Sequence, residues 1–382
     1  MRVAFIGTRG VPAAYSGFET FVEELGARLA ERGHEVTVYC RRHFYRDHPP
    51  VHRGMRLVHV PGIASKHLDT FTHTAVSTAH AVVQGYDAVI MCISGNSPFA
   101  VFPRAVGTRV VLNVDGSDWR RQKWGHLARA YIRTSEWIAT RTPDVTVTDS
   151  EVMQRFYRES MGAETECIAY GADLPEPREG GLLKRMGLVP REYFLLVGRL
   201  VPENCAHHLV EAYERLRPRL RCVIVGDAPY AKQYIADLKR RGPHVDFPGY
   251  VFGDGYRELV HNAYATVLCS EVGGTHPVLV EAMSAGSCVI VNDTPANMEV
   301  IADAGLAYQG SRGSDSLAEV MAWALENEAA VEDYRGRARE RALTSYSWEA
   351  VTDRYEHLLR RLLEHKSTTA VRTTAAGEST ES

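Results

Sequence analysis

A glycine-rich turn followed by a short helix is the segment of this chain best suited to bind a charged ligand. Gly273, Gly274 and Thr275 leave backbone N–H groups accessible just before Pro277, a residue favoured at the first position of a helix. Glu281 follows one turn later on the same face of that predicted helix. The N–H groups and the positive end of the helix dipole attract phosphate, whereas a carboxylate accepts hydrogen bonds from sugar hydroxyls. The spacing therefore indicates a site for a ligand that carries both phosphates and hydroxyls, such as a nucleotide-sugar.

A second glycine-rich loop follows the apolar run at the N-terminus. Gly7 ends that run, and Gly10 and Gly17 come before a predicted helix over 18–32, so a ligand can approach the backbone closely. A tight turn needed only for packing explains the same glycines. The spacing lacks the G-x-G-x-x-G fingerprint of dinucleotide sites, and Arg41 stands where that fingerprint needs an acid. The loop therefore disfavours an NAD-type oxidoreductase.

Two more predicted strands end in charged side chains. Arg199 comes just after an apolar run, where a guanidinium can fork onto a diphosphate; a surface ion pair with Glu203 is the alternative. Asp115 follows another apolar run and is a candidate contact for an acceptor hydroxyl. Asp118 is better explained as the N-cap of the following helix.

The helix predicted after Asp118 is basic and aromatic. Its cations are Arg120, Arg121, Lys123, Arg129, Arg133 and Arg141, and its aromatic residues are Trp119, Trp124, Tyr131 and Trp137. An amphipathic surface of this kind can rest on an anionic membrane. A solvated helix with one aromatic face in the core explains the same residues, so both interpretations stay open.

Composition excludes several classes of protein. The net charge of −3 over 382 residues argues against bulk nucleic-acid binding, and no apolar run is long enough to span a bilayer. Gly7 interrupts the first apolar run, which therefore indicates a strand and not a secretory signal. The 7 cysteines form no C-x-x-C pair and the histidines show no metal-ligand spacing. We expect a cytoplasmic protein with reduced thiols and no bound metal.

Apolar runs alternate with helix-period segments twice along the chain, a pattern typical of parallel α/β sheets. We expect two Rossmann-like, doubly wound domains, over 1–172 and 192–347. Proline, glycine and charge concentrate between them, so 173–191 is the predicted linker. A C-terminal helix over 348–366 is expected to pack back on the first domain. The segment 367–382 has little to bury and is expected to be disordered.

Taken together, these motifs resemble glycosyltransferase family 4, whose members have the GT-B fold of two Rossmann-like domains facing a central cleft. The resemblance rests on the N-terminal glycine loop, Gly198-Arg199, Gly249-Tyr250-Val251, Ser270, Glu281-Ala282-Met283 with Gly286, and Glu299-Val300-Ile301. A closer similarity is to a subgroup of bacterial rhamnosyltransferases whose N-terminal domain was long of unknown function. The motifs shared with that subgroup lie at 16–21, 113–116, 119–121, 200–204 and 274–277.

The resemblance implies a donor site on the second domain. Arg199 would contact the donor diphosphate, Glu281 the ribose, and the loop from Tyr250 the base. With the candidates found from the residues themselves, the predicted catalytic residues are Arg199, Asp115, His276 and Glu281. The predicted donor-binding residues are Gly10, Gly17, Gly198, Arg199, Asn204, Tyr250, Val251, Gly273, Gly274, Thr275, His276 and Glu281. The predicted acceptor-binding residues are Phe18, Glu19, Asp115 and Trp119.

Two positions depart from the family pattern. Asn204 stands where the family usually has a lysine, so the expected phosphate clamp has one cation fewer. Gly273 stands where the family usually has a glutamate that contacts the sugar. The subgroup shares the second change, which favours an altered donor geometry over an inactive protein.

Family 4 enzymes retain the anomeric configuration, and the departing diphosphate takes the acceptor proton. The resemblance therefore implies a metal-independent glycosyltransferase without a cofactor. We expect it to move a sugar, L-rhamnose from a dTDP- or UDP-linked donor, onto a saccharide or lipid-linked acceptor in surface polysaccharide biosynthesis, at or near the cytoplasmic membrane face. The alternatives are a GT-B nucleotide-sugar epimerase and a non-catalytic nucleotide-sugar-binding subunit of a polysaccharide assembly complex.

Overall fold

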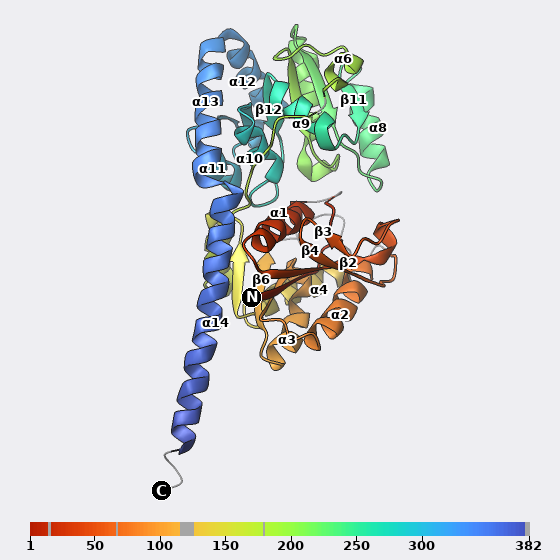
Figure 1. Ribbon diagram of the computed structural model, residues 1–382. Helices are drawn as coiled ribbons and strands as arrows, with labels where there is room; N and C mark the ends of the chain where they lie inside the picture. Colours follow the sequence, from red (N-terminus) through yellow and green to blue (C-terminus); the bar gives the residue numbers. More distant parts are fainter. Residues whose placement is uncertain (14–16, 66–67, 115–125, 179, 379–382) are drawn as a thin grey trace. The chain divides into compact units, whose positions relative to one another are not determined.

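The chain forms two compact units in the computed structural model, which describes residues 1–13, 17–65, 68–114, 126–178 and 180–378 (Figure 1). Unit 1 combines Met1–Ala169 with Trp348–Ser382, and unit 2 is Tyr170–Ser347. Each unit contains one mainly parallel sheet flanked by helices. The α/β class predicted from the alternating apolar runs is therefore confirmed.

The sheet of unit 1 has eight strands in the order β3-β4-β2-β1-β5-β6-β7-β8. Every neighbouring pair is parallel except β3 and β4, which form a short antiparallel hairpin. The strands are β1 (Arg2–Ile6), β2 (Glu35–Arg41), β3 (Val51–His52), β4 (Met55–Val60), β5 (Ala88–Cys92), β6 (Arg109–Val114), β7 (Val145–Thr148) and β8 (Glu166–Cys167). The chain leaves β1 toward β2 and later returns to β5 on the other side, so the switch point of this sheet lies between β1 and β5.

Helices of unit 1 follow most of its strands. They are α1 (Gly17–Glu31), α2 (Asp69–Val82), α3 (Val101–Ala105), α4 (His126–Ala139), α5 (Glu151–Met161) and α14 (Trp348–Glu378), with 3-10 turns η1 (Arg42–Phe44) and η2 (Ser94–Ala100). Helix α14 continues through 367–378, a stretch that we expected to be disordered. Extending an existing helix costs much less free energy than nucleating a new one. The packed first half of α14 provides the nucleated helix from which 367–378 continues.

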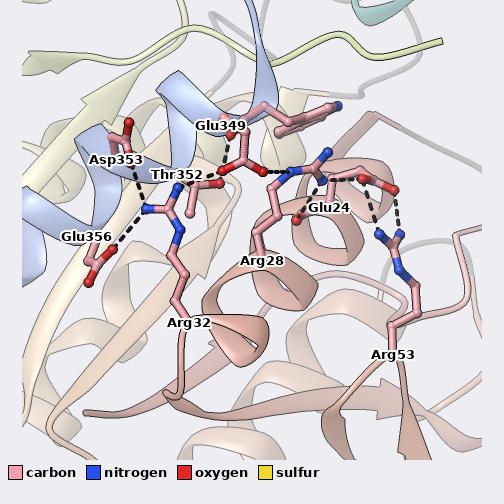
Figure 2. A network of polar contacts seen from close by, with 9 residues as sticks. Glu24, Arg28, Arg32, Arg53, Glu349, Thr352, Asp353 and Glu356 are labelled. Carbon is pink, nitrogen blue, oxygen red and sulfur yellow. Dashed lines mark hydrogen bonds and ion pairs between the residues drawn. The ribbon is translucent and has the colours of Figure 1, made fainter. Parts of the chain in front are cut away.

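Helix α14 is attached to α1 by an apolar contact and a network of ion pairs. The ring of Phe21 lies 5.3 Å from that of Tyr355, whose hydroxyl accepts a hydrogen bond from Asn113 at the end of β6. Arg32 contacts Asp353 and Glu356, at 2.7 and 2.9 Å (Figure 2). The remaining members of this network are Arg28, Glu349, Glu24 and Arg53. Charges from three guanidiniums and four carboxylates thus alternate across this surface of unit 1 (Figure 2).

We expect Glu356→Gln to make the stability of unit 1 less dependent on acid. Hydrogen bonds from Arg360 and Arg32 lower the pKa of Glu356 to about 2, below the value of 4.5 that it would have when unfolded. The stabilisation is therefore complete above pH 4.5 and is lost as the pH falls from 4.5 toward 2. Denaturant unfolding at pH 7 should show a loss of roughly 1–2 kcal/mol for the variant, and this difference should shrink at pH 3.

The matched control for this prediction is Glu159→Gln. Glu159 is exposed on α5 and has no ion pair among the residues that the structure describes. The control should follow the wild-type acid dependence. An equal loss of stability for wild type and Glu356→Gln between pH 5 and pH 3 would contradict the role of this carboxylate.

The sheet of unit 2 has six parallel strands in the order β11-β10-β9-β12-β13-β14. They are β9 (Tyr193–Val197), β10 (Arg221–Val225), β11 (Asp246–Gly249), β12 (Ala265–Leu268), β13 (Cys288–Asn292) and β14 (Leu306–Tyr308). The helices are α6 (Leu182–Met186), α7 (Ala206–Leu216), α8 (Lys232–Arg241), α9 (Gly253–Asn262), α10 (Pro277–Ser284), α11 (Pro295–Ile301), α12 (Ser314–Glu326) and α13 (Glu328–Ser345), with η4 (Pro202–Asn204) and η5 (Gly310–Arg312). Phe194, Ile224 and Ile290 are fully buried between sheet and helices.

Candidate functional site

The predicted donor residues of unit 2 lie at the carboxyl edge of its sheet, whereas Gly10 and Gly17 belong to unit 1. All six strands are parallel, so the loops that follow them open on the same edge. The chain turns from β9 toward β10 on one side, and β12 lies on the other, so the switch point falls between β9 and β12. The loop after β9 carries Arg199, and the loop after β12 carries Gly273 to His276. The structure thus brings these two motifs, about 75 residues apart in sequence, to the position where open parallel sheets bind ligands.

Asn204 fixes the loop that carries Arg199. Its side-chain amide donates a hydrogen bond to the carbonyl of Arg199 at 2.8 Å, and its carbonyl oxygen accepts one from the Ser270 hydroxyl at 3.4 Å. The N–H of Glu271 also reaches the carbonyl of Glu203, at 3.2 Å. The resemblance predicts a lysine at this position. This chain instead has an amide whose hydrogen bonds join the β9 loop to the β12 loop.

The turn after β9 also depends on Gly226, which sequence reasoning did not single out. Its φ is +139°, and a Cβ built on it would lie 1.8 Å from the carbonyl oxygen of Gly198. The N–H of Gly198 bonds the carbonyl of Val225 at 3.0 Å, and the N–H of Gly226 bonds that of Gly249 at 2.9 Å. Only glycine permits this close approach of three strand ends.

Gly273 and His276 are coupled sterically. Gly273 has a φ of +142°, and a Cβ on it would lie 2.9 Å from the His276 ring. His276 is the N-cap residue of α10, and its carbonyl accepts the N–H of Leu279 at 2.9 Å. Gly274 and Thr275 are buried just before it. The imidazole therefore occupies the side where a side chain at 273 would point, which explains physically why a glutamate is absent at that position.

Tyr256 is a second residue that sequence reasoning missed. It lies on α9, and its hydroxyl donates a short hydrogen bond to Oε2 of Glu281 on α10. Burial and the adjacent carboxylate raise the pKa of Tyr256 well above its usual value, so the phenol stays a donor. Tyr256 therefore orients the carboxylate that we expect to bind sugar hydroxyls.

We expect Tyr256→Phe to raise the donor KM about tenfold with a smaller change in kcat. A hydrogen bond to a charged group contributes roughly 1.5–3 kcal/mol, and without it Glu281 loses its fixed orientation. The melting temperature should change little, since the ring itself remains. Tyr334→Phe is the control, because Tyr334 packs against the core of unit 2 from α13 and its ring lies under the Arg337 guanidinium. A wild-type KM in Tyr256→Phe would show that this contact has no part in donor binding.

The loop after β11 carries two neighbouring aromatic rings. Tyr250 and Phe252 stack with centroids 5.6 Å apart, and both are exposed, by 44% and 62%. The Tyr250 hydroxyl donates to the carbonyl of Asp227 after β10, at 3.2 Å. Val251 lies between them in sequence and is partly buried. The loop thus offers both backbone groups and a flat apolar surface to a base.

The corresponding loop of unit 1 lies at that unit's switch point. Gly10 has a φ of +110°, and a Cβ on it would lie 2.5 Å from Sγ of Cys40, so packing alone requires glycine here. Phe18 and Glu19 are buried in the first turn of α1, which Gly17 begins. These two side chains therefore present little surface to an acceptor. Their acceptor role stays a prediction, and Asp115 and Trp119 lie outside the described residues.

Asn96 joins the two loops at the switch point of unit 1. Its amide donates to the carbonyl of Cys92 at 2.7 Å and to that of Gly7 at 3.4 Å, and its oxygen accepts from the Thr74 hydroxyl at 2.9 Å. Ile93, three residues earlier, has a φ of +74°, which is rare for a β-branched residue. Asn96 was not singled out from the sequence, although the Ser-Gly-Asn-Ser stretch that contains it directly follows an apolar run.

One group of described side chains has the composition of a metal site. Cys205, His207 and His208 place one ligand atom each within 4.8 Å of one another at the start of α7. The two Nδ1 atoms are already hydrogen-bonded, to the hydroxyls of Tyr234 and Tyr308, both at 3.0 Å. Burial raises the pKa of Cys205 to about 12, so its thiol resists ionisation. His208 is buried on α7.

Two known families match separate parts of the chain. Residues 187–341 match the family described as glycosyl transferases group 1, and residues 1–173 match a domain of unknown function, DUF1972. No curated protein shows significant sequence similarity to the chain. Of the described helices, none is both long enough and apolar enough to cross a membrane.

Solved structures of similar fold cover nearly the whole chain. Sucrose-phosphate synthase from Thermosynechococcus elongatus aligns with a TM-score of 0.81 at 19% identity, over 95% of this chain and 99% of its own. HepE of Anabaena in complex with UDP-glucose aligns with a TM-score of 0.77 at 17% identity, over 94% and 100%. WaaG, a glycosyltransferase involved in lipopolysaccharide biosynthesis, aligns at 0.69 with 18% identity, over 92% and 98%. The chain thus has the two-domain α/β GT-B fold, and together with the family match this supports a glycosyltransferase.

Proposed function

We propose that this chain is a retaining, metal-independent glycosyltransferase that takes its sugar from a nucleotide-sugar held by unit 2. The observation that carries the proposal is the meeting of Arg199, the turn at Gly273 to His276 and Glu281 beside one switch point. A guanidinium and backbone N–H groups suit a diphosphate, and an oriented carboxylate suits ribose hydroxyls. The structural likeness to HepE, which was solved with UDP-glucose, supports this class of donor.

In the proposed reaction the protein forms no covalent bond with either substrate. The bond between the anomeric carbon and the leaving phosphate oxygen breaks, and the acceptor oxygen bonds to the same face of that carbon. The acceptor proton passes to the departing diphosphate, so charge and atoms balance without a protein nucleophile or a metal. Arg199 and the N–H groups before α10 then act by stabilising the charge that develops on the leaving group. Positioning of the two substrates supplies the rest of the rate enhancement.

We assign the sugar preference to Thr275 and His276. The resemblance favours L-rhamnose on a dTDP- or UDP-linked donor and a saccharide or lipid-linked acceptor in surface polysaccharide biosynthesis. Support comes from the replacement of the family's glutamate by Gly273, against which the His276 ring packs. A cytoplasmic location with peripheral contact to the membrane belongs to the same proposal.

The direct test is an assay of purified protein against a panel of nucleotide-sugars, with and without saccharide acceptors. We expect release of nucleoside diphosphate only when an acceptor is present, at the same rate in EDTA. Donor turnover without acceptor would instead identify a nucleotide-sugar epimerase. Tight donor binding without turnover across the panel would identify a non-catalytic subunit, the alternative favoured by the uncharged Asn204.

We expect His276→Ala to change which sugar is preferred. Loss of the imidazole opens space beside Gly273, so the ratio of kcat/KM between two donors with the same nucleotide should shift by about tenfold, a change of about 1.4 kcal/mol. His244→Ala is the control, because His244 lies outside this loop and pairs with Glu214. A variant with altered nucleotide affinity but unchanged sugar preference would refute the assignment.

A further inference from the structure

Unit 2 contains a pocket of about 390 Å³ that the proposed reaction does not use. Arg191, Asn262 and Gly286, which line it, come just before β9, β12 and β13. Because these strands are parallel, the pocket lies at the amino edge of the sheet, opposite the edge that carries Arg199 and Glu281. Its other wall is α13, which packs beside α10 (Figure 1).

Positive charge exceeds negative charge in this pocket. Arg191, Arg335 and Arg339 line it together with two carboxylates. Those carboxylates are mostly in water: Glu332 is 73% exposed and pairs with Arg335 at 2.6 Å, and Glu176 is 82% exposed and lies 3.4 Å from His261.

The three guanidiniums are only partly satisfied. Within the part of the chain that the structure describes, Arg339 has no hydrogen bond or ion pair, and Arg191 bonds a single carbonyl, that of Ala263, at 3.1 Å. Arg335 is 8% exposed and bonds the carbonyl of Tyr264, but its Nε has no acceptor among the described groups. Partial desolvation and the neighbouring Arg335 lower the pKa of Arg191. The pocket therefore has three arginines against two carboxylates, and the one carboxylate that pairs with an arginine, Glu332, lies mostly in water.

A glycine lines the pocket. Gly336 lies in the interior of α13, between Arg335 and Arg339. A Cβ built on it would meet no atom within 4 Å, so packing does not require glycine there. Glycine also weakens a helix relative to alanine. Neither packing nor helix stability therefore accounts for glycine at this position.

We propose that this pocket binds a phosphate group, either free or at the end of a small metabolite or lipid, through Arg191, Arg335 and Arg339. Guanidinium groups form planar, paired hydrogen bonds with phosphate oxygens, and a phosphate supplies the negative charge that the pocket lacks. The volume lies at the small end of the range for ligand sites, which leaves room for a phosphate and a short organic group. This site is separate from the donor site and does not depend on the proposed reaction.

The test is titration calorimetry with inorganic phosphate at constant ionic strength. It is done in Arg199→Ala protein, so that phosphate in the donor loop does not contribute. We expect one site, weakened at least tenfold by Arg339→Ala and tightened several-fold by Glu332→Gln, which removes the competing carboxylate. Gly336→Leu should weaken binding by filling the space without changing charge. Arg337→Ala, on the same helix but paired with Asp333 outside the pocket, should leave binding unchanged.

Two further measurements make the outcome decisive. Glycerol 3-phosphate presents the phosphate group on a small metabolite, and vesicles containing phosphatidic acid present it on a lipid. Whichever of the two binds more tightly, and loses that binding in Arg339→Ala, shows whether the natural ligand is a metabolite or a lipid. Thermal unfolding of each variant checks that it is folded. Absence of phosphate binding, or binding that Arg339→Ala and Gly336→Leu both leave intact, would overturn the proposal. A lower melting temperature without any effect on phosphate would show that the arginines only stabilise the C-terminal end of α10.

Discussion

Arg199→Ala is expected to lower kcat by about 10²- to 10³-fold, with a smaller rise in the donor KM. The guanidinium follows β9 at the switch point, where it can stabilise negative charge that grows on the leaving diphosphate. The β9 loop has the neutral Asn204 where the resemblance predicts a second cation, so this loop offers the leaving group one arginine without lysine support. The measurement is release of nucleoside diphosphate at saturating donor and acceptor.

Two companion variants make this prediction specific. Arg199→Lys keeps the charge but loses the planar fork, so its kcat should fall between those of wild type and Arg199→Ala. Arg215→Ala removes an exposed arginine of α7 that pairs with Asp315, and it should have wild-type kinetics. If Arg199→Ala turned over donor as fast as Arg215→Ala, the diphosphate would have to be stabilised by other groups.

Gly226→Ala is expected to destabilise unit 2 by about 3 kcal/mol and to abolish transfer. The new Cβ would lie 1.8 Å from the carbonyl oxygen of Gly198, and neither backbone segment can move without breaking a ladder of hydrogen bonds. Overpacking of this kind costs roughly 1–3 kcal/mol, and the left-handed φ adds about 1–2 kcal/mol. Because Gly198 precedes Arg199, the displaced backbone also moves the phosphate-binding side chain.

Gly253→Ala separates the cost of the steric clash from the cost of the left-handed backbone conformation. Gly253 has a φ of +61° in the same unit, but a Cβ at this position would have no other atom within 4 Å. The variant should therefore lose only the conformational part, about 1–2 kcal/mol. Denaturant unfolding followed by a probe in unit 2 gives both values. Equal stability of the two alanine variants would contradict the close contact between Gly226 and Gly198.

Several strands of both sheets were predictable because they contain an uninterrupted apolar run of four or more residues. The runs at 2–6, 88–92, 193–197 and 288–292 all form buried strands. Strands β3, β8 and β14 were missed, since two or three residues carry no recognisable pattern. The tail at 367–378 was expected to be disordered because local composition was judged without the helix that precedes it.

The candidate site was predictable only in part. Arg199 and Glu281 were identified because a loop after a strand, or a glycine turn before a helix, is visible within a few residues. Tyr256 was missed because its partner is 25 residues away in sequence, on another helix. Gly226 was missed because its importance comes from the backbone of a neighbouring strand, which sequence alone does not place beside it.

The attachment of α14 to α1 has a consequence for protein synthesis. Unit 1 is built from the first 169 residues and from a helix that begins at Trp348, so this helix leaves the ribosome after the whole of unit 2. Unit 2 lies entirely between them and has its full sequence available earlier. The usual order, in which the N-terminal domain finishes folding first, is therefore reversed. A nascent chain that stalls before Trp348 would expose Phe21 and leave Arg32 without its carboxylate partners, a surface that chaperones and proteases recognise.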